Sequence, residues 1–195
     1  MLTKRRAGNG NIQVQKLGDD GLLSQPILIS PDTAAARLDY SYLASQRQTR
    51  RRRSGFFALR DITQLITRGS YMSSQRKGLS FPVFHTTDFV DGSPIVPSQF
   101  WLTKEAQRVA NGVLAQSGDI LVARVGRNLH QKIGIVTGET VAVSDCILVL
   151  RVEPQYQKRV FDFLAGAKGR AALLGASHGV GAAFITIDAL QSLEI

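Results

Sequence analysis

The residues that decide the fold of this chain are Ser117-Gly-Asp-Ile-Leu-Val-Ala-Arg-Val-Gly126. This stretch opens with turn-forming residues and continues as an apolar run that is typical of a buried strand. Two further segments, Lys132-Ile-Gly-Ile-Val-Thr137 and residues 140–152, have the same character and predict a second and a third strand. The middle of the chain therefore predicts a β-sheet core.

Helices are predicted on both sides of this strand block. Upstream, apolar residues recur at helical spacing before a natural stop at Gly69: Leu59, Ile62, Leu65 and Ile66. Downstream, another set marks a helix face that is expected to break near Gly169: Tyr156, Val160, Phe163, Leu164 and Ala167. Residues 103–110 predict a short helix, and residues 81–84 and 184–187 predict short strands. Strands in one block with helices at their flanks predict the α+β class, with a mixed or antiparallel sheet.

Residues 1–55 are predicted to form a basic extension, and residues 56–195 a single domain. The extension lacks clear periodicity over its first 30 residues, apart from a short strand at Pro26-Ile-Leu-Ile29. Its one predicted helix is capped by Asp32 and has a shared apolar face, formed by Ala35, Leu38 and Tyr42.

The net charge of +9 is concentrated in the first part of the chain. Residues 1–80 contain 14 Lys and Arg against five Asp and Glu, whereas residues 81–195 contain ten of each. Much of the excess lies in Arg47 and in one run: Arg50, Arg51, Arg52 and Arg53. Such a run is either a solvated linker or a surface that faces phosphates, because guanidinium groups pair with phosphate oxygens. The charge favours a nucleic acid in general as the partner.

The single cysteine and the absence of long apolar runs bear on the compartment. Cys146 cannot form a disulfide within the chain, and its apolar neighbours predict a small buried residue. No run of about 18 apolar residues exists, so no membrane span is predicted. The basic N-terminus lacks the apolar stretch of a secretory signal. These features predict a reducing, cytoplasmic setting.

Few residues have the spacing that catalysis or metal binding requires. His85, His130 and His178 have no Cys, His or carboxylate at ligand spacing, so no metal or other cofactor is predicted. The glycines of residues 175–181 match neither a P-loop nor a dinucleotide-binding turn and predict a mobile loop. Ser177 beside His178 lacks the orienting group that a nucleophile and its base require.

A metal-dependent nuclease is the enzymatic alternative. Asp119 and Glu139 flank strands as the acids of such nucleases do, but the lysine that commonly follows the second acid is absent. Asp119 is more simply a turn residue that hydrogen-bonds its own backbone. Metal-dependent cleavage that is lost in Asp119→Ala would favour the nuclease.

Three polar loops between apolar segments carry residue types that read DNA. Arg and Lys pair with guanine in the major groove, and Asn and Gln pair with adenine. The predicted DNA contacts are Arg68, Arg76, Lys77, Arg124, Arg127, Asn128, His130, Lys132 and His178. The run of residues 50–53 is expected to add phosphate contacts that do not specify sequence. Each loop alone is commonly a solvated turn, but three on a basic chain without catalytic residues favour a DNA-reading surface.

The stretch from Leu59 to Ile195 resembles the target-recognition domain of type I restriction-modification specificity subunits. The resemblance is carried by an ordered series of segments: Leu59-Arg-Asp-Ile62 with Gly69, the GDIL and following Arg and Gly of residues 117–126, Lys132-Ile-Gly-Ile-Val136, Ser144-Asp-Cys-Ile-Leu-Val-Leu-Arg151, Phe163-Leu164 with Gly169, the glycine-rich loop, and Ile187 to Leu193. Upstream, Arg37-Leu-Asp-Tyr-Ser-Tyr42 looks like the segment that often precedes such domains.

This resemblance implies a non-catalytic domain that reads one half of a split site in double-stranded DNA. It implies an adenine-specific DNA methyltransferase subunit as partner, which flips the adenine into its own pocket. A restriction subunit and a second specificity chain are further implied partners, in the cytoplasm of a prokaryote. A full specificity subunit has two recognition domains and long spacer helices, whereas this chain has one domain. It is therefore expected to be a half-subunit, a truncated or split gene product, or a module that joins another chain.

A second alternative is an interaction scaffold whose basic run binds RNA or an acidic protein. Deletion of residues 1–55 would then abolish binding, and no duplex sequence would be preferred. A recognition domain predicts instead that the deletion weakens binding and leaves the sequence preference intact.

Overall fold

The computed structural model describes residues 2–6, 10–36, 40, 43, 57–179 and 182–195. The chain divides into two compact units, Met1–Arg53 and Ser54–Ile195, each of which has its own apolar core. The boundary that the sequence placed between residues 55 and 56 falls outside the described ranges and stays a prediction. Within these ranges, no helix is long and apolar enough to cross a membrane.

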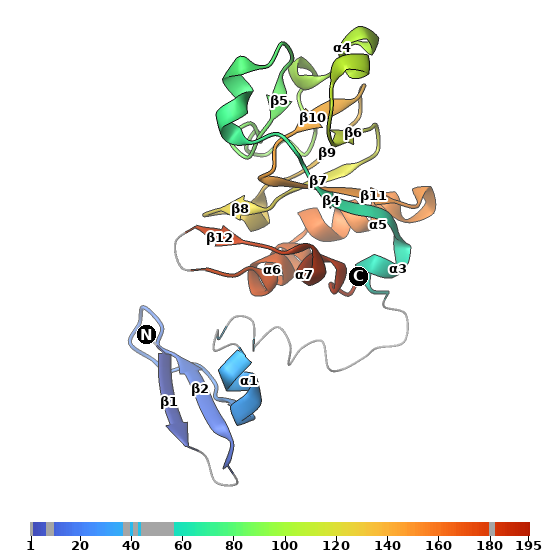
Figure 1. Ribbon diagram of the computed structural model, residues 1–195. Coiled ribbons are helices and arrows are strands. Elements are labelled where there is room, and N and C mark those ends of the chain that lie inside the picture. The colour runs from blue at the N-terminus through green and yellow to red at the C-terminus, as the bar shows by residue number, and fades with distance from the viewer. Residues whose placement is uncertain (1, 7–9, 37–39, 41–42, 44–56, 180–181) are drawn as a thin grey trace. The chain divides into compact units, whose positions relative to one another are not determined.

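The first unit is a small antiparallel sheet followed by a helix (Figure 1). Its elements are β1 (Leu2–Arg6), β2 (Ile12–Lys16), β3 (Ile27–Ile29) and α1 (Pro31–Ala36). The strand order is β1-β2-β3, and alternate residues of β2 and β3 point into one core. That core contains Ile12, Val14, Ile27, Ile29 and Leu43. The short strand predicted at residues 26–29 is confirmed, whereas β1 and β2 lie in a segment for which no strand was predicted.

Helix α1 differs from its prediction at its start and in the face it was expected to bury. It begins at Pro31, and the Ser30 hydroxyl accepts a hydrogen bond from the Thr33 amide at 3.2 Å. Ser30 therefore caps the helix, and the prediction that Asp32 does so is wrong. Ala35 is exposed, so its predicted place on an apolar face is also wrong. The other two residues of that face, 38 and 42, lie outside the described residues.

The second unit is built around the stretch that follows the turn at residues 117–119. Strand β7 (Ile120–Ala123) lies inside a four-stranded antiparallel sheet with the order β4-β11-β7-β9. The other strands are β4 (Thr63–Arg68), β11 (Ile147–Val152) and β9 (Ile133–Ile135). In the central pair, Leu121 stands opposite Val149 and Ile120 opposite Leu150.

Both faces of this four-stranded sheet are buried. Side chains of a strand point alternately to the two faces, so Ile120 and Val122 join one core while Leu121 joins another. The first core lies against helices α5 (Pro154–Ala165), α6 (Ala167–Ala176) and α7 (Ile187–Gln191) (Figure 1). Continuous burial on two faces explains why β7, and β11 from Ile147 to Leu150, are uninterrupted apolar runs in the sequence.

A second, mixed sheet covers the opposite face (Figure 1). Its strands are β5 (Val83–Phe84), β10 (Val141–Val143) and β6 (Leu114–Ala115), in the order β5-β10-β6. Strand β10 is parallel to β5 and antiparallel to β6. The layer between the two sheets contains Phe84, Leu121, Val143, Ile147 and Val149. Two antiparallel or mixed sheets with flanking helices confirm the predicted α+β class.

The remaining elements are short. They are α3 (Leu59–Ile62), η2 (Ser73–Gly78), η3 (Ser98–Phe100), α4 (Lys104–Val109), β8 (Val125–Gly126), η4 (Leu129–Gln131) and β12 (Ala183–Phe184). Helix α4 is confirmed as predicted, with the Thr103 hydroxyl accepting from the Ala106 amide. The predicted strand at residues 184–187 is shorter and starts earlier, since Thr186 already caps α7. Residues 187–191 thus form a helix, and Glu194 after it forms an isolated antiparallel bridge with Ala58.

The helix predicted from Leu59 ends after one turn. From Thr63 the chain becomes β4, which pairs with β11 between Thr63 and Arg68. The apolar residues of this segment have helical spacing, but backbone pairing with β11 makes it a strand. As a result Leu65 is 39% exposed at the edge of the sheet. Gly69 follows a strand rather than a helix, and a Cβ at this position would collide with the Ser144 carbonyl.

The single strand predicted over residues 140–152 is two strands in two sheets. Strands β10 and β11 are separated by the turn Ser144–Cys146, and the Ile147 amide donates to the Ser144 carbonyl. Cys146 lies in this turn and is only half-buried, with its sulfur 3.8 Å from the Ser73 hydroxyl. The prediction of a buried apolar Cys146 is wrong because the residue precedes the strand that its apolar neighbours form.

The helix predicted to break near Gly169 breaks at Gly166 instead. Gly169 is buried within α6, where a Cβ would collide with the Phe163 carbonyl. Its absent side chain allows α5 and α6 to meet closely. Helix α6 continues through Ala176, so the first residues of the mobile loop predicted at 175–181 are helical.

Candidate nucleic-acid interface

The turn Ser144–Cys146 brings two of the three predicted loops together. On one side, the Asp145 amide donates to the Tyr71 carbonyl at 2.9 Å. On the other side, the Arg124 amide donates to the Cys146 carbonyl at 2.8 Å. The loop that contains η2 and the loop that follows β7 are therefore neighbours, although they are about 50 residues apart in the sequence.

The third loop joins the same region through a short strand pair. Strand β12 pairs with β8, and the Ile185 amide donates to the Arg124 carbonyl at 2.9 Å. In Figure 1, β8 and β12 project beyond the end of the four-stranded sheet. Arg124 thus lies where all three loops meet.

Two of the predicted DNA contacts, Arg68 and Arg124, line one groove of about 480 Å³. The rest of its wall is formed by Ile185, Thr186, Ile187 and Asp188. Arg68 is exposed at the end of β4, while the Arg124 Nε donates to the Asp145 carbonyl at 2.9 Å. One hydrogen bond fixes the plane of the Arg124 guanidinium and leaves its other donors unassigned, an arrangement suited to a phosphate oxygen.

Arg76 is held by a carboxylate. Its Nη2 donates to the Asp88 Oδ2 at 2.6 Å, and the same oxygen accepts from the His85 amide at 2.8 Å. This ion pair ties η2 to the segment that follows β5. The adjacent Lys77 is exposed and forms no ion pair within the described residues.

In the loop after β7, some of the predicted DNA contacts are bonded to the protein and others are exposed. The Lys132 ammonium donates to the Thr86 carbonyl at 2.9 Å and is half-buried. Arg127 and Asn128 are exposed between β8 and η4. A DNA molecule at this loop would therefore meet Arg127 and Asn128 more readily than Lys132.

His85 lies among these groups, although the sequence predicted no role for it. Its Nδ1 is 2.7 Å from the Ser144 hydroxyl and its Nε2 is 3.5 Å from the Ser73 hydroxyl. Burial lowers the pKa of His85 below its ordinary value, and the nearby Arg76 lowers it further. A neutral His85 can link the Ser144 turn to η2. No sequence pattern marks it, because its partners come from distant segments.

His130 and His178, the two histidines predicted to contact DNA, differ in their surroundings. His130 points inward, with a buried Nδ1 that has no hydrogen-bond partner in the described part of the chain, and burial lowers its pKa. His178 stacks on Phe184 with ring centroids 5.4 Å apart, and its backbone pairs with that residue. His130 is thus half-buried, with one ring nitrogen closed to a ligand. The arginine run of residues 50–53 lies outside the described residues.

The two acids of the nuclease alternative lie in different environments, since Asp119 is buried and Glu139 is exposed. Both Asp119 oxygens accept from Arg151, at 2.9 and 2.7 Å, and one also accepts from the Gln116 amide at 2.8 Å. The predicted turn role of Asp119 is confirmed, and the bidentate pair to Arg151 is an addition that the sequence did not suggest. Glu139 is exposed, and among the described residues no group of three or more potential ligands could hold a metal.

Ser177 is placed as a helix-terminal residue. It follows the end of α6, is 7% exposed, and its hydroxyl donates to the Leu174 carbonyl at 2.8 Å. This geometry resembles an ordinary C-terminal cap more than a nucleophile aimed at a substrate.

Comparisons with known proteins give structural matches only. No protein-family model and no curated protein matches the sequence. The HsdS subunit from Thermoanaerobacter tengcongensis is similar at 16% identity and a TM-score of 0.49, over 79% of this chain and 38% of that one. The S subunit of a type I restriction-modification system from M. genitalium is similar at 11% identity and a TM-score of 0.47, over 71% and 33%.

A third similar structure concerns complex assembly and conformational transition of the type I restriction-modification system. It matches at 17% identity and a TM-score of 0.44, over 80% of this chain and 39% of that one. This chain therefore spans about two-fifths of the length of the structures it matches, or less.

Proposed function

We propose that this protein binds double-stranded DNA in a sequence-specific manner, as the non-catalytic specificity component of a type I-like restriction-modification methyltransferase complex. It would supply one recognition domain and act with an adenine-specific methyltransferase subunit. The restriction subunit and a second specificity chain are further candidate partners. Methylation and cleavage would be carried out by the partners.

The observation that carries the proposal is the convergence of three polar loops around Arg124. The loops come from residues near 70, 125 and 180, and each contributes at least one nominated residue. Loops on a rigid scaffold are the usual place for binding residues. Here the scaffold is a sheet buried on both faces, which fixes the positions from which the loops extend.

The nominated residues divide into two groups by their contacts. Arg68, Lys77, Arg127 and Asn128 are exposed and would touch DNA directly. Arg76, Arg124 and Lys132 are each bonded to a protein oxygen, so they would present fixed donors. His178 would contact DNA beside β12, and His130 would contact DNA through its Nε2, since its Nδ1 is buried. The run of residues 50–53 would add phosphate contacts without specifying sequence.

The test is a selection from randomised duplexes with the full chain, alone and with an adenine-specific methyltransferase subunit, at two salt concentrations. Enrichment of a half-site of about three to five base pairs is expected. Replacement of residues 50–53 by glutamine should weaken binding and leave the enriched sequence unchanged. Salt-sensitive binding that enriches no sequence, with or without the methyltransferase, would contradict the proposal and favour the interaction scaffold.

A further inference from the structure

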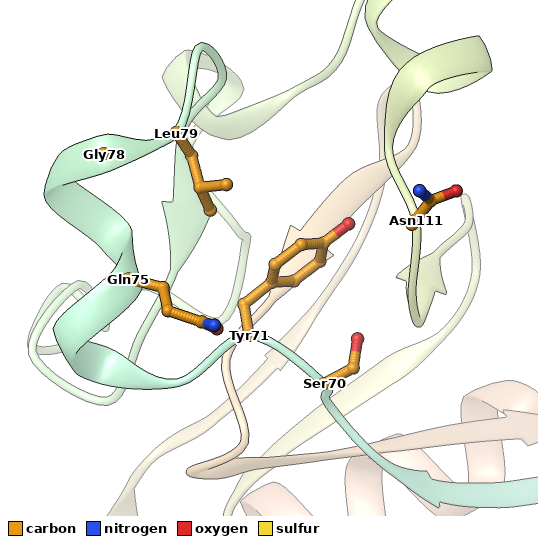
Figure 2. Close-up of a pocket in the computed structure, with 6 residues that line it drawn as sticks. All are labelled: Ser70, Tyr71, Gln75, Gly78, Leu79 and Asn111. Atoms are coloured by element: carbon orange, nitrogen blue, oxygen red, sulfur yellow. The ribbon is translucent and has the colours of Figure 1, made fainter.

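A pocket of about 480 Å³ lies at the base of η2 (Figure 2). It is lined by Ser70, Tyr71, Gln75, Gly78, Leu79 and Asn111. In Figure 2 the Tyr71 ring stands in the middle, with Gln75 and Leu79 on one side and Ser70 and Asn111 on the other. The sequence suggested no function for these residues beyond turns.

The lining carries no charge but has several hydrogen-bonding groups. The Ser70 hydroxyl accepts from the Val113 amide at 2.8 Å and keeps its own proton for donation. The Gln75 Oε1 accepts from the Met72 amide at 3.0 Å, which leaves its NH₂ group as a donor. Asn111 is exposed, and its amide forms no hydrogen bond to any described residue. A neutral polar lining does not suit a free anion or a metal ion.

The Tyr71 hydroxyl is the most informative atom of the pocket. Tyr71 is 7% exposed, and its ring packs edge-on against Phe81 with centroids 5.6 Å apart. Its hydroxyl is buried and has no hydrogen-bond partner among the residues that the structure describes. Burial raises the pKa of Tyr71, so the hydroxyl keeps its proton and is a donor. Buried polar groups usually have a partner, and one without a partner suggests a ligand.

Cations lie directly beside this neutral pocket. Arg76 and Lys77 occupy the two positions between the lining residues Gln75 and Gly78. Arg76 is tied to Asp88, whereas Lys77 is exposed. A ligand with a neutral, planar, hydrogen-bonding part and an adjacent phosphate would meet both features at once. A nucleotide has this chemistry.

We propose that this pocket receives a nucleobase that has left the stack of the bound DNA, while Lys77 contacts the neighbouring phosphate. The proposal rests on the proposed DNA binding. The edges of paired bases are open to contact in the grooves, but a pocket that surrounds a whole base can be filled only by a base that has left the stack. Recognition of such a base by hydrogen bonds to its edge and by packing against an aromatic ring is the usual mode.

The test compares three duplexes of the selected sequence, bound to the full-length chain. One is fully paired, one carries a single unpaired nucleotide, and one carries an unpaired abasic residue at the same place. The chain should bind the duplex with the unpaired base about tenfold more tightly than the abasic duplex, because two or more hydrogen bonds depend on the base. The unpaired position is moved along the duplex in steps of one nucleotide.

Two variants locate the effect. Asn111→Ala and Tyr71→Phe should each reduce the ratio between unpaired-base and abasic duplexes toward one. Lys77→Ala should weaken binding of all three duplexes equally. Gln64→Ala is the matched amide control, since Gln64 is exposed on β4 and about 20 Å along the extended chain from Ser70. This control should leave the ratio unchanged.

Tyr71→Phe also separates a structural role from a binding role. Loss of a buried hydroxyl without a partner should leave the melting temperature unchanged or raise it, so weaker discrimination cannot reflect unfolding. Equal affinity for the unpaired-base and abasic duplexes at every position would overturn the pocket proposal. A ratio that survives both Asn111→Ala and Tyr71→Phe would also overturn it. Failure to bind any duplex, paired or unpaired, would instead overturn the proposed function.

Discussion

Two arginine–aspartate ion pairs occupy different regions of the second unit, one bidentate and one with a single hydrogen bond. In the sheet, Arg151 contacts Asp119 at 2.7 Å, and at the loops Arg76 contacts Asp88 at 2.6 Å. Each carboxylate also accepts from a backbone amide. The side chain of Asp119 is 3% exposed and that of Asp88 is 18% exposed. One kind of contact thus fixes the fold in the sheet and holds a candidate binding loop at the other site.

The largest expected effect is on the sheet pair. Asp119→Ala should lower the free energy of unfolding by about 3 kcal/mol, because it leaves Arg151 and the Gln116 amide without their partner. Urea denaturation with and without the substitution measures this. A nuclease would show a different result: loss of metal-dependent DNA cleavage with little loss of stability.

Loss of the Arg76–Asp88 pair should affect DNA binding more than stability. Asp88→Ala should cost only about 1 kcal/mol of unfolding free energy, since its pair is partly solvated, but should weaken binding to the selected duplex about tenfold. The reason is that η2 loses its tie to the segment after β5. Fluorescence anisotropy with labelled duplex measures the affinity. Asp119→Asn is the matched control, because asparagine keeps a side-chain oxygen that accepts from the Gln116 amide. If Asp88→Ala binds the duplex with unchanged affinity, the Arg76–Asp88 pair is not needed to position η2 for binding.

Exposed and held cations should differ in their effect on salt dependence. Lys77→Ala and Arg127→Ala should each reduce the slope of log affinity against log salt by about 0.9, with little change in stability. Binding titrations over a range of salt concentrations give the slope. Lys168→Ala, an exposed cation on α6, serves as the control and should leave the slope unchanged. An unchanged slope for Lys77→Ala or Arg127→Ala would show that the side chain concerned does not contact a phosphate.

The smallest expected effect is on the pH dependence of stability. The folded-state pKa of His85 and that of His130 are lowered, so the unfolded chain takes up protons more readily than the folded one. Their contribution is complete above the ordinary pKa near 6.5 and is lost as the pH falls below it. Thermal melts from pH 7.5 to 5.5 should therefore show decreasing stability. In His85→Gln the decrease should be shallower, and an unchanged curve would contradict the assignment to His85.

Part of the fold could be predicted from local pattern. The strands β7, β9 and β11 and the helix α4 were predicted because their residues are apolar runs or capped helical repeats. The helix predicted to continue from Leu59 failed because β11 offers a ladder that the local sequence does not reveal. The strand predicted over residues 140–152 failed because the apolar pattern continues through the Ser144–Cys146 turn.

The candidate site was predicted only as a set of residue types. Arg68 and Arg124 were nominated separately, and the groove they share depends on β4 and β7 lying in one sheet. Asp88, His85 and the pocket around Tyr71 were missed. Their roles come from contacts with residues distant in the sequence, for which a single sequence carries no signal.

The sequence by itself determined the α+β class, the buried central strands and the three polar loops that separate them. It did so because burial and turn formation depend on residue type and short-range spacing. The tertiary structure alone decided which cations are held by Asp88, Asp145 and Thr86, and which are exposed. It also decided that a neutral pocket lies beside Lys77. The physical reason is that hydrogen bonds, burial and electrostatic environment are set by neighbours in space, and strand pairing chooses those neighbours.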